Sequence, residues 1–256
     1  MATALITGAT SGIGREIAWQ LAAERMNLIL VARSADRLEE VAEHIRQVAD
    51  VEVEVLPADL SQAEGTLRVC ERLIDDERPV GLLVNNAGFG LGQDFVGGDI
   101  ERELNALNVM VRAVLMTCHA AIPGMVARGG GGILNIASMA ALTAQGTYSA
   151  HKAWVRTFTE GLAASLKGTG VNATVVCPGL VHTEFHEKVD VDSGQWPESA
   201  FIPAERVAAE AIEGVRRGKV VVTPSRRYRA LAGALKVAPR SLVRAVAGPE
   251  RSGRRG

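Results

Sequence analysis

Short apolar runs alternate along the chain with longer segments whose apolar residues recur at helical spacing. The first pattern is typical of buried strands, and the second is typical of amphipathic helices that pack against them. The short runs predict strands at residues 2–7, 28–32, 51–56, 81–85, 133–137, 171–177 and 220–223. The helical spacing predicts helices at residues 13–25, 34–48, 61–76, 100–128, 148–166 and 204–217.

This alternation of strands and helices predicts the fold class. Such units place their strands parallel in one sheet, with right-handed crossovers and helices on both faces. The composition agrees, because 47% of the residues are hydrophobic but only 4% are aromatic, which suits a parallel sheet buried under helices. We therefore predict a single α/β domain over residues 1–225, built on a Rossmann-type, doubly wound parallel sheet of about seven strands.

A glycine-rich turn, Thr7-Gly-Ala-Thr-Ser-Gly-Ile-Gly14, joins the first predicted strand to the first helix. In a doubly wound sheet this junction binds a dinucleotide, whose pyrophosphate meets the free N–H groups of the helix N-terminus. The three glycines allow a tight turn, close approach of the backbone to the phosphates, and close packing of the helix. The predicted cofactor contacts of this turn are Gly8, Thr10, Ser11, Gly12, Ile13 and Gly14.

The end of the second predicted strand bears on the choice between NAD(H) and NADP(H). An acid there would hydrogen-bond the adenosine ribose and repel a 2′-phosphate. This chain has Arg33 and Ser34 instead. The guanidinium can bind a phosphate, and the hydroxyl can add a hydrogen bond. We therefore expect NADP(H) to be preferred over NAD(H).

Tyr148 and Lys152 are candidate acid–base residues, because a spacing of four places them on one face of a helix. Tyrosine ordinarily keeps its proton to about pH 10, and a nearby cation lowers the pKa of the phenol. A phenol closer to neutrality can donate and accept a proton during turnover. Alone, the pair also fits a half-buried tyrosine beside a solvated lysine.

Together, the glycine turn, Arg33 and the Tyr148/Lys152 pair resemble the short-chain dehydrogenase/reductase family, over about residues 2–224. The resemblance implies an oxidoreductase that transfers hydride between NADP(H) and a ketone or secondary alcohol. The alternative is a non-catalytic protein that binds NADP(H) as a redox sensor. Turnover of a carbonyl compound would discriminate between the two.

Further family motifs occur in chain order, each after a predicted strand. Asp59-Leu60 resembles the pair that contacts the adenine. Asn85-Asn-Ala-Gly88 resembles the motif that steadies the central sheet and lines the cofactor, and the segment from Pro178 to Thr183 resembles the motif that holds the nicotinamide. The cofactor contacts implied by the resemblance are Asp59, Leu60, Asn86, Ala87, Gly88, Tyr148, Lys152, Pro178, Gly179, Val181 and Thr183.

The resemblance also implies four catalytic residues: Asn108, Ser138, Tyr148 and Lys152. Tyr148 is the general acid or base, and Ser138 orients the carbonyl oxygen. Lys152 lowers the pKa of Tyr148 and binds the nicotinamide ribose, while Asn108 belongs to a proton relay through a water near Lys152. The ten-residue step from Ser138 to Tyr148 is shorter than is usual in the family, so we expect the loop 139–147 to reshape the substrate pocket.

Other chemistry is not expected from this sequence. The five histidines form no ligand cluster, so we predict no metal site. The three cysteines are far apart and form no CxxC motif, which is typical of reduced thiols in a cytoplasmic protein. The start of the chain runs directly into a strand and does not resemble a signal peptide. Phe185, Trp196 and Phe201 suggest an apolar substrate face, or equally a packed loop.

The C-terminal extension, residues 226–256, differs in charge from the rest of the chain. From Arg216 onward there are twelve Lys or Arg and one acid, Glu250, although the whole chain has a net charge of −1. We expect two short amphipathic helices that pack on the acidic body or on a partner subunit, followed by a disordered end. Contact with an anionic membrane surface is the alternative. No nucleic-acid-reading motif is present, and the family resemblance suggests a homo-oligomer.

Overall fold

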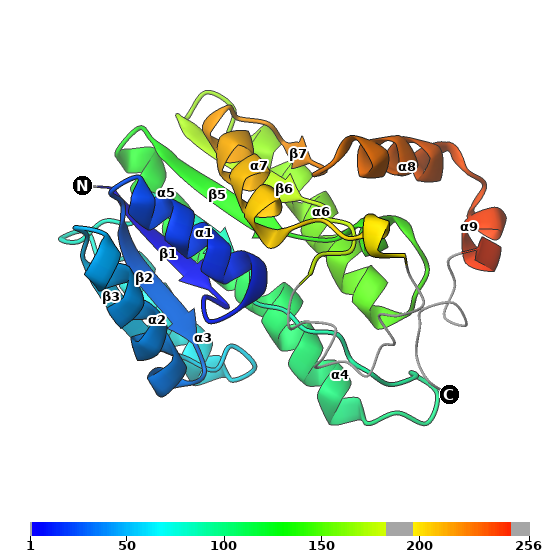
Figure 1. Ribbon diagram of the computed structural model, residues 1–256, viewed down its shortest axis with the longest axis horizontal. Helices are drawn as coiled ribbons and strands as arrows, with labels where there is room; N and C mark the ends of the chain where they lie inside the picture. Colours follow the sequence, from blue (N-terminus) through cyan, green and yellow to red (C-terminus); the bar gives the residue numbers. More distant parts are fainter. Residues whose placement is uncertain (1, 183–196, 247–256) are drawn as a thin grey trace.

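The computed structural model describes residues 2–182 and 197–246, and it confirms the predicted fold class. Within these residues the sheet has seven parallel strands in the order β3-β2-β1-β4-β5-β6-β7 (Figure 1). Each predicted strand is present, with ends within two residues of those expected. The strands are β1 (Thr3–Thr7), β2 (Asn27–Ala32), β3 (Val53–Pro57), β4 (Leu82–Asn85), β5 (Gly131–Ile136), β6 (Val171–Val176) and β7 (Val221–Val222).

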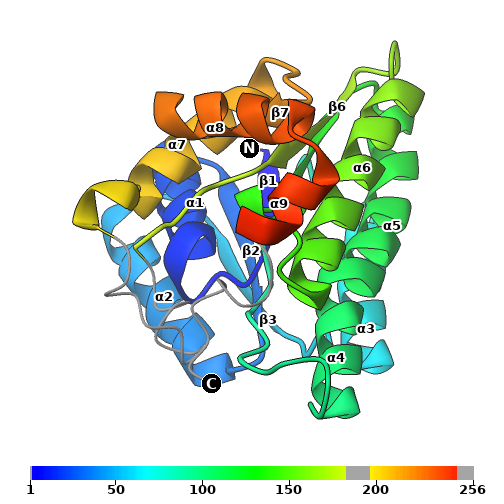
Figure 2. The same cartoon turned by 90° about the vertical axis from the view of Figure 1, so that its right-hand side faces the viewer.

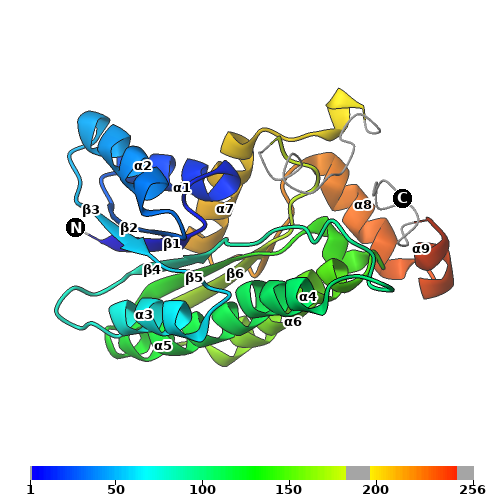
Figure 3. The same cartoon turned by 90° about the horizontal axis from the view of Figure 1, so that it is seen from below.

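Helices cover both faces of the sheet (Figure 3). One layer consists of α1 (Gly12–Ala23), α2 (Ala35–Val48) and α7 (Ala204–Arg216). The other consists of α3 (Ala63–Leu73), α4 (Ile100–Leu107), α5 (Ala113–Ala127) and α6 (Thr147–Ser165).

Alternate residues of each strand point to opposite faces and so build two separate cores. In β1, Ala4 and Ile6 join the core under α1, α2 and α7, whereas Leu5 joins the core under α3, α5 and α6. All three are fully buried. Because helices cover both faces of the sheet, the sequence of this strand is one continuous apolar run.

The long helix predicted at residues 100–128 is interrupted at a point that matters for the site. A π-helical turn, Asn108–Arg112, separates α4 from α5, and the Ala113 N–H donates to the Asn108 carbonyl oxygen five residues earlier. Such a turn inserts one extra residue into a helix and is frequent at functional sites. Periodicity averaged over a long apolar segment does not reveal a single inserted residue.

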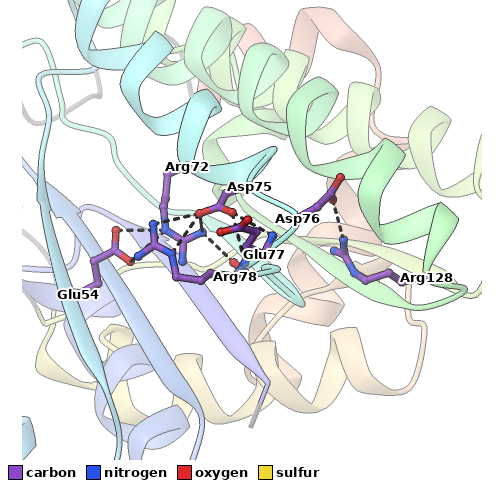
Figure 4. Close-up of polar contacts among 7 residues, drawn as sticks. All are labelled: Glu54, Arg72, Asp75, Asp76, Glu77, Arg78 and Arg128. Carbon is purple, nitrogen blue, oxygen red and sulfur yellow. Dashed lines mark hydrogen bonds and ion pairs between the residues drawn. The ribbon is translucent and has the colours of Figure 1, made fainter.

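An ion-pair network joins β3, α3 and the segment before β4, at the amino edge of the sheet (Figure 4). The guanidinium of Arg72 is buried, and it donates to both carboxylate oxygens of Glu54, at 3.0 and 3.1 Å, and to the Arg78 carbonyl oxygen, at 2.8 Å. Asp75 pairs with Arg78 at 3.0 Å. The network therefore fixes this edge, on the side away from the carboxyl ends of the strands.

The extension forms two helices, α8 (Arg226–Val237) and α9 (Arg240–Val246). They continue from β7 at the carboxyl end of the sheet, far from the N-terminus (Figure 1). Seen from that end, α9 lies in front of the sheet between the two helical layers (Figure 2). The extension is thus on the same side of the molecule as the loops that follow the strands.

Candidate active site

Tyr148 and Lys152 lie one turn apart on α6, as their spacing predicts. The Lys152 ammonium nitrogen is 5.8 Å from the centroid of the Tyr148 ring, and only 5% of the lysine is exposed. It donates a hydrogen bond of 2.9 Å to the Ile136 carbonyl oxygen, at the end of β5. The ammonium is thus fixed between the tyrosine and a central strand.

Ser138 joins this pair from the end of β5. Its side chain hydrogen-bonds Tyr148, and its Oγ accepts a hydrogen bond of 3.1 Å from the Ala140 N–H. The second contact caps a short 3-10 helix, Met139–Leu142. The structure therefore brings together three of the four residues that the sequence indicates as catalytic.

The short loop between Ser138 and Tyr148 is tied to α6 along its length. Thr143 Oγ1 lies 2.9 Å from Ser149 Oγ, and the Gln145 N–H donates to the same Ser149 oxygen at 3.1 Å. Gly146, with φ of 81°, makes the turn into the helix. These contacts hold the loop against the helix that carries Tyr148.

The protein's own groups raise the pKa of Tyr148 rather than lower it. The side chain is partly exposed as a whole, but burial around its hydroxyl raises the pKa to about 12, and the Ser138 hydrogen bond offsets only part of this increase. Burial likewise lowers the pKa of Lys152 to about 8. The lowering contribution of Lys152 to the pKa of Tyr148 stays a prediction, and the helical spacing on which it rests carries no information about burial.

Asn108 stands apart from the other three candidates. Its side-chain amide donates to the Ser61 carbonyl oxygen, at 3.0 Å, and so ties the π-helical turn to the segment after β3. The described contacts of its side chain do not include Lys152. The bond to Ser61 is a positioning contact that the sequence did not indicate.

The glycine turn packs against the loop that follows β4. The Asn86 amide donates to the carbonyl oxygens of Thr7 and Gly8, at 3.0 and 3.1 Å, and the Thr7 hydroxyl accepts from the backbone N–H groups of Asn86 and Ala87. Gly8 and Gly12 have positive φ, and a Cβ at Gly14 would overlap the Asn86 amide. These glycines are therefore required by conformation and by close approach.

The start of α1 fits an anionic group. Its cap residue, Ser11, makes no capping side-chain hydrogen bond, and the first turn contains no acidic residue. The N-terminal N–H groups and the helix dipole are thus available to a pyrophosphate. Gly88 lies across the site, where a Cβ would come within 3.3 Å of the Lys152 ammonium. A cofactor that follows this path would pass from the glycine turn toward Lys152.

The residues that follow β2 and β3 differ in whether their side chains could contact a cofactor. Arg33 is exposed and makes no hydrogen bond or ion pair with other described residues. Ser34 caps α2 by accepting from the Arg37 N–H at 3.3 Å. Asp59 accepts hydrogen bonds from the N–H and hydroxyl of Ser61, and the Leu60 side chain lies in the core. Only the backbone of Leu60 is therefore available to a cofactor.

The loop after β6 is anchored to the loop after β5. The Pro178 carbonyl oxygen accepts a hydrogen bond of 2.8 Å from the Met139 N–H. Val181 is buried and forms an isolated parallel bridge with Ile202. Thr183, the last predicted contact of this motif, lies outside the described residues, as do Phe185 and Trp196.

A buried chain of polar side chains fastens α5 and α6 to the centre of the sheet. Asn85 on β4 donates to Asn135 on β5 at 2.9 Å, and Asn135 donates to Thr159 on α6 at 2.9 Å. Thr117 on α5 donates to Asn85 at 2.8 Å. Because both asparagine amides are hydrogen-bonded, these contacts fix the position of α6, which carries Tyr148, relative to the strands.

Sequence reasoning missed three residues near the site. Glu103 is buried at 8% exposure and accepts from Thr147, which starts α6, at 2.6 Å. His151 on α6 is equally buried, and burial lowers its pKa. Tyr228 contacts the loop after β6 from the extension. A buried acid or histidine gives no periodic signal, but Tyr228 is one of two tyrosines in the chain, which could have drawn attention to it.

Metal binding has no support in the part of the chain that the structure describes. These residues include no group of three His, Cys, Asp or Glu side chains placed to hold an ion. His182 instead pairs with Glu198 at 2.7 Å and stacks on Phe201, while His186 lies outside the described ranges.

Known proteins resemble this chain in both sequence and architecture. A family model described as short chain dehydrogenase matches residues 2–194. Sulfoacetaldehyde reductase 2 of Chromohalobacter salexigens is 37% identical over 186 residues, which are 71% of this chain and 73% of that protein.

Two solved structures extend the comparison. A short-chain dehydrogenase from Sphingobium yanoikuyae in complex with NADPH has a TM-score of 0.84 and 32% identity, over 92% of this chain and 94% of that one. A short chain dehydrogenase/reductase from Burkholderia phymatum in complex with NAD has a TM-score of 0.79 and 25% identity, over 91% and 92%. With the glycine turn at the first strand and the Ser138, Tyr148 and Lys152 side chains gathered beyond it, these matches place the chain in the short-chain dehydrogenase/reductase family of oxidoreductases.

Proposed function

We propose that the protein is an NADP(H)-dependent carbonyl reductase or alcohol dehydrogenase that interconverts a ketone and a secondary alcohol. The observation that carries the proposal is the meeting of Ser138, Tyr148 and Lys152 beside a glycine turn whose helix N-terminus is free of side-chain caps. The sulfoacetaldehyde reductase relative supports the reduction of a carbonyl group, and the NADPH-bound neighbour supports the cofactor.

When bound, the nicotinamide cofactor would supply the hydride that passes to the carbonyl carbon. Tyr148 would donate its proton to the carbonyl oxygen as charge develops there. Ser138 would hydrogen-bond the same oxygen and stabilise that charge. Lys152 would hold the nicotinamide ribose and favour the phenolate that remains on Tyr148 after proton transfer.

Reprotonation of Tyr148 completes the cycle. We assign this relay to Lys152 and Asn108, through a water between them. One N–H of the Asn108 side-chain amide donates to the Ser61 carbonyl oxygen, and its Oδ1 is the atom that would accept a hydrogen bond from the water. The relay returns one proton from solvent for each one donated to the substrate.

The raised pKa of Tyr148 supports a proton-donating role. With a pKa of about 12, the phenol is almost fully protonated near neutrality and ready to give its proton to a carbonyl oxygen. Removing a proton from an alcohol requires the phenolate first, and the protein's own groups disfavour it. The raised pKa therefore fits the role of Tyr148 as the proton donor when a carbonyl is reduced.

NADP(H) is our proposed cofactor. Arg33 is exposed, carries a planar guanidinium and has no partner among the described residues, so it is free to bind a 2′-phosphate. Ser34 can add its hydroxyl as a donor while it accepts from Arg37. The NADPH-bound neighbour supports this choice, and the NAD-bound one makes the direct comparison of the two cofactors necessary.

The test is turnover. The purified protein should oxidise NADPH when offered a panel of small and medium-sized apolar ketones and aldehydes, followed at the nicotinamide absorbance. The Tyr148→Phe variant should bind NADPH but reduce none of them. NADPH binding without turnover of any carbonyl in the wild-type protein would overturn the proposal in favour of a redox sensor.

We further propose a cytoplasmic homo-oligomer assembled through the helices of the second layer. Leu104 and Leu107 on α4 and Leu115 on α5 expose large apolar side chains. Large exposed apolar surfaces are typical of protein–protein interfaces. Light scattering after size exclusion tests this, and a monomer at micromolar concentration would refute it.

We also propose that the extension, residues 226–256, makes peripheral contact with a membrane. Arg226, Arg227 and Lys236 are exposed and make no ion pair with other described residues, and Val237 is 84% exposed beside them. Such a surface suits anionic headgroups. Full-length protein should sediment with phosphatidylserine vesicles, and the Arg226→Glu/Arg227→Glu variant should not. Equal sedimentation of the two proteins would refute this role.

A further inference from the structure

The first turn of α8 is fixed to the body of the protein. Ser225, just before the helix, is 5% exposed and has a φ of 74°, which is unusual for a residue with a Cβ. Its N–H donates to Glu210 on α7 at 3.4 Å. Arg229 pairs with the same carboxylate at 3.3 Å and donates to the Thr223 carbonyl oxygen. The direction in which α8 leaves the sheet is therefore determined by α7.

This orientation brings Tyr228 onto the loop after β6. The phenol oxygen accepts a hydrogen bond of 3.2 Å from the Leu180 N–H and donates one of 2.9 Å to the Ala200 carbonyl oxygen. The Ile202 N–H donates to the Leu180 carbonyl oxygen at 2.9 Å, so the same two segments are also joined directly. A single hydroxyl thus bridges residues that lie twenty positions apart in the chain.

The ring of Tyr228 explains a glycine in the motif after β6. A Cβ on Gly179 would overlap three atoms of that ring, and these are its nearest neighbours. The backbone of Gly179 does not have the positive φ that would itself require glycine. Gly179 is therefore needed because Tyr228 packs directly on the peptide, and the two positions form one contact.

The extension also reaches the loop after β5. Arg240, at the start of α9, donates to the Leu142 carbonyl oxygen at 3.3 Å, in the short helix that follows Ser138. Leu235 and Lys236 of α8 face Leu142 across a surface groove. The two loops that border the site, after β5 and after β6, are thus both held by residues 226–240.

We propose that Tyr228 is a positioning residue of the active site. Its hydroxyl and ring hold Gly179, Leu180 and Ala200 in one arrangement, and through them the extension sets the loop that would face the nicotinamide and the substrate. The proposal rests on the proposed function, because it assigns this loop to a nicotinamide site. It gives the extension a role within its own chain.

Paired substitutions at Tyr228 and Gly179 test the contact itself. Tyr228→Phe removes the hydroxyl but keeps the ring, and Tyr228→Ala removes both. Gly179→Ala introduces the overlap with the ring, and the double variant Gly179→Ala/Tyr228→Ala relieves it. Leu231→Ala, at an exposed site on α8, is the matched control.

The expected results follow from the geometry. Tyr228→Phe should speed hydrogen exchange of the Leu180 amide at least tenfold. Tyr228→Ala and Gly179→Ala should each raise the Kd for NADPH and the KM for the carbonyl about tenfold, with kcat within about threefold of wild type, because orientation is lost but the reacting groups remain. In the Tyr228→Ala background, Gly179→Ala should have no further effect.

Three outcomes would overturn the proposal. In the first, the Leu180 amide exchanges equally in Tyr228→Phe and wild type. In the second, exchange rises but the Kd for NADPH and the KM stay unchanged, which would make the contact merely structural. In the third, Gly179→Ala raises the Kd for NADPH and the KM by the same factor in the wild-type and the Tyr228→Ala backgrounds. Exchange and NADPH binding need no turnover, so they test Tyr228 even if no carbonyl is reduced and the proposed function fails.

Discussion

The Lys152 ammonium lies 5.8 Å from the centre of the Tyr148 ring and donates to the Ile136 carbonyl oxygen at 2.9 Å. Burial around the two titrating groups moves their pKa values in opposite directions, to about 12 for Tyr148 and about 8 for Lys152. Each shift favours the neutral form. The pair is therefore best described as a phenol that keeps its proton beside an ammonium that readily loses one.

The rate of carbonyl reduction should depend on the charge of Lys152. With a pKa of about 8, the ammonium is lost as the pH rises above that value, and with it the stabilisation of the tyrosine phenolate. We expect kcat to be level up to about pH 8 and then to fall roughly tenfold per pH unit. Steady-state assays across this range measure it. A kcat that stays level to about pH 10 would contradict the assigned role of Lys152.

The free energy of unfolding should depend on pH through the same lysine, Lys152. Between its folded pKa of about 8 and its unfolded value near 10.5, the unfolded chain binds a proton at Lys152 that the folded chain does not. The free energy of unfolding should therefore rise with pH in this window, by roughly 1.4 kcal/mol per pH unit. Tyr148, with a raised pKa, acts in the opposite sense between about pH 10 and 12.

Urea unfolding of wild type and Lys152→Met separates this effect from the other titrating groups. From about pH 7.5 to 9.5, wild type should gain roughly 2 kcal/mol relative to the variant. A difference between the two proteins that does not change with pH would show that Lys152 has an ordinary pKa in the folded state.

Arg33→Ala should weaken NADPH binding selectively. Loss of a charge-assisted contact to the 2′-phosphate costs about 1.5–3 kcal/mol, which is a rise of roughly 10- to 150-fold in Kd. The Kd for NADH should change less than about twofold, because NADH lacks that phosphate. Fluorescence titration of both cofactors measures this, with Arg217→Ala, an exposed arginine at the end of α7, as the control. An equal loss for NADPH and NADH would remove Arg33 from phosphate recognition.

Arg72→Met should destabilise the protein without affecting the site. The substitution leaves the Glu54 carboxylate and the Arg78 carbonyl oxygen without their buried donor. We expect the free energy of unfolding to fall by about 3 kcal/mol, with kcat unchanged. Arg68→Met, one turn earlier on α3 at a half-exposed ion pair, should cost less than about 0.5 kcal/mol. Similar losses of unfolding free energy in the two variants would show that the ion-pair network contributes little to stability.

Much of the candidate site could be predicted from the sequence because its parts are local. The glycine turn, Arg33 at the end of β2 and the spacing of Tyr148 and Lys152 each depend on a few neighbouring residues and on the strand–helix pattern around them. Ser138 meets Tyr148 because one ends a strand and the other begins the next helix. The parallel sheet then brings these ends together at one edge.

The rest depends on contacts that sequence spacing does not contain. Burial raises the pKa of Tyr148, and this burial comes from the packing of several elements, which the spacing of helix neighbours does not reveal. The bond from Asn108 to Ser61 spans 47 residues, and that from Tyr228 to Leu180 spans 48. The apolar pattern of the extension predicts two helices, but it does not indicate that one of them reaches the loop after β6.

The most direct test of the central claim is carbonyl reduction by Tyr148→Phe. The variant keeps the ring beside Lys152 and loses only the hydroxyl, so NADPH should still bind with a Kd within about threefold of wild type. Its kcat for the best carbonyl substrate of the wild-type protein should fall at least about a thousandfold. A kcat within about tenfold of wild type would contradict the assignment of Tyr148 as the proton donor.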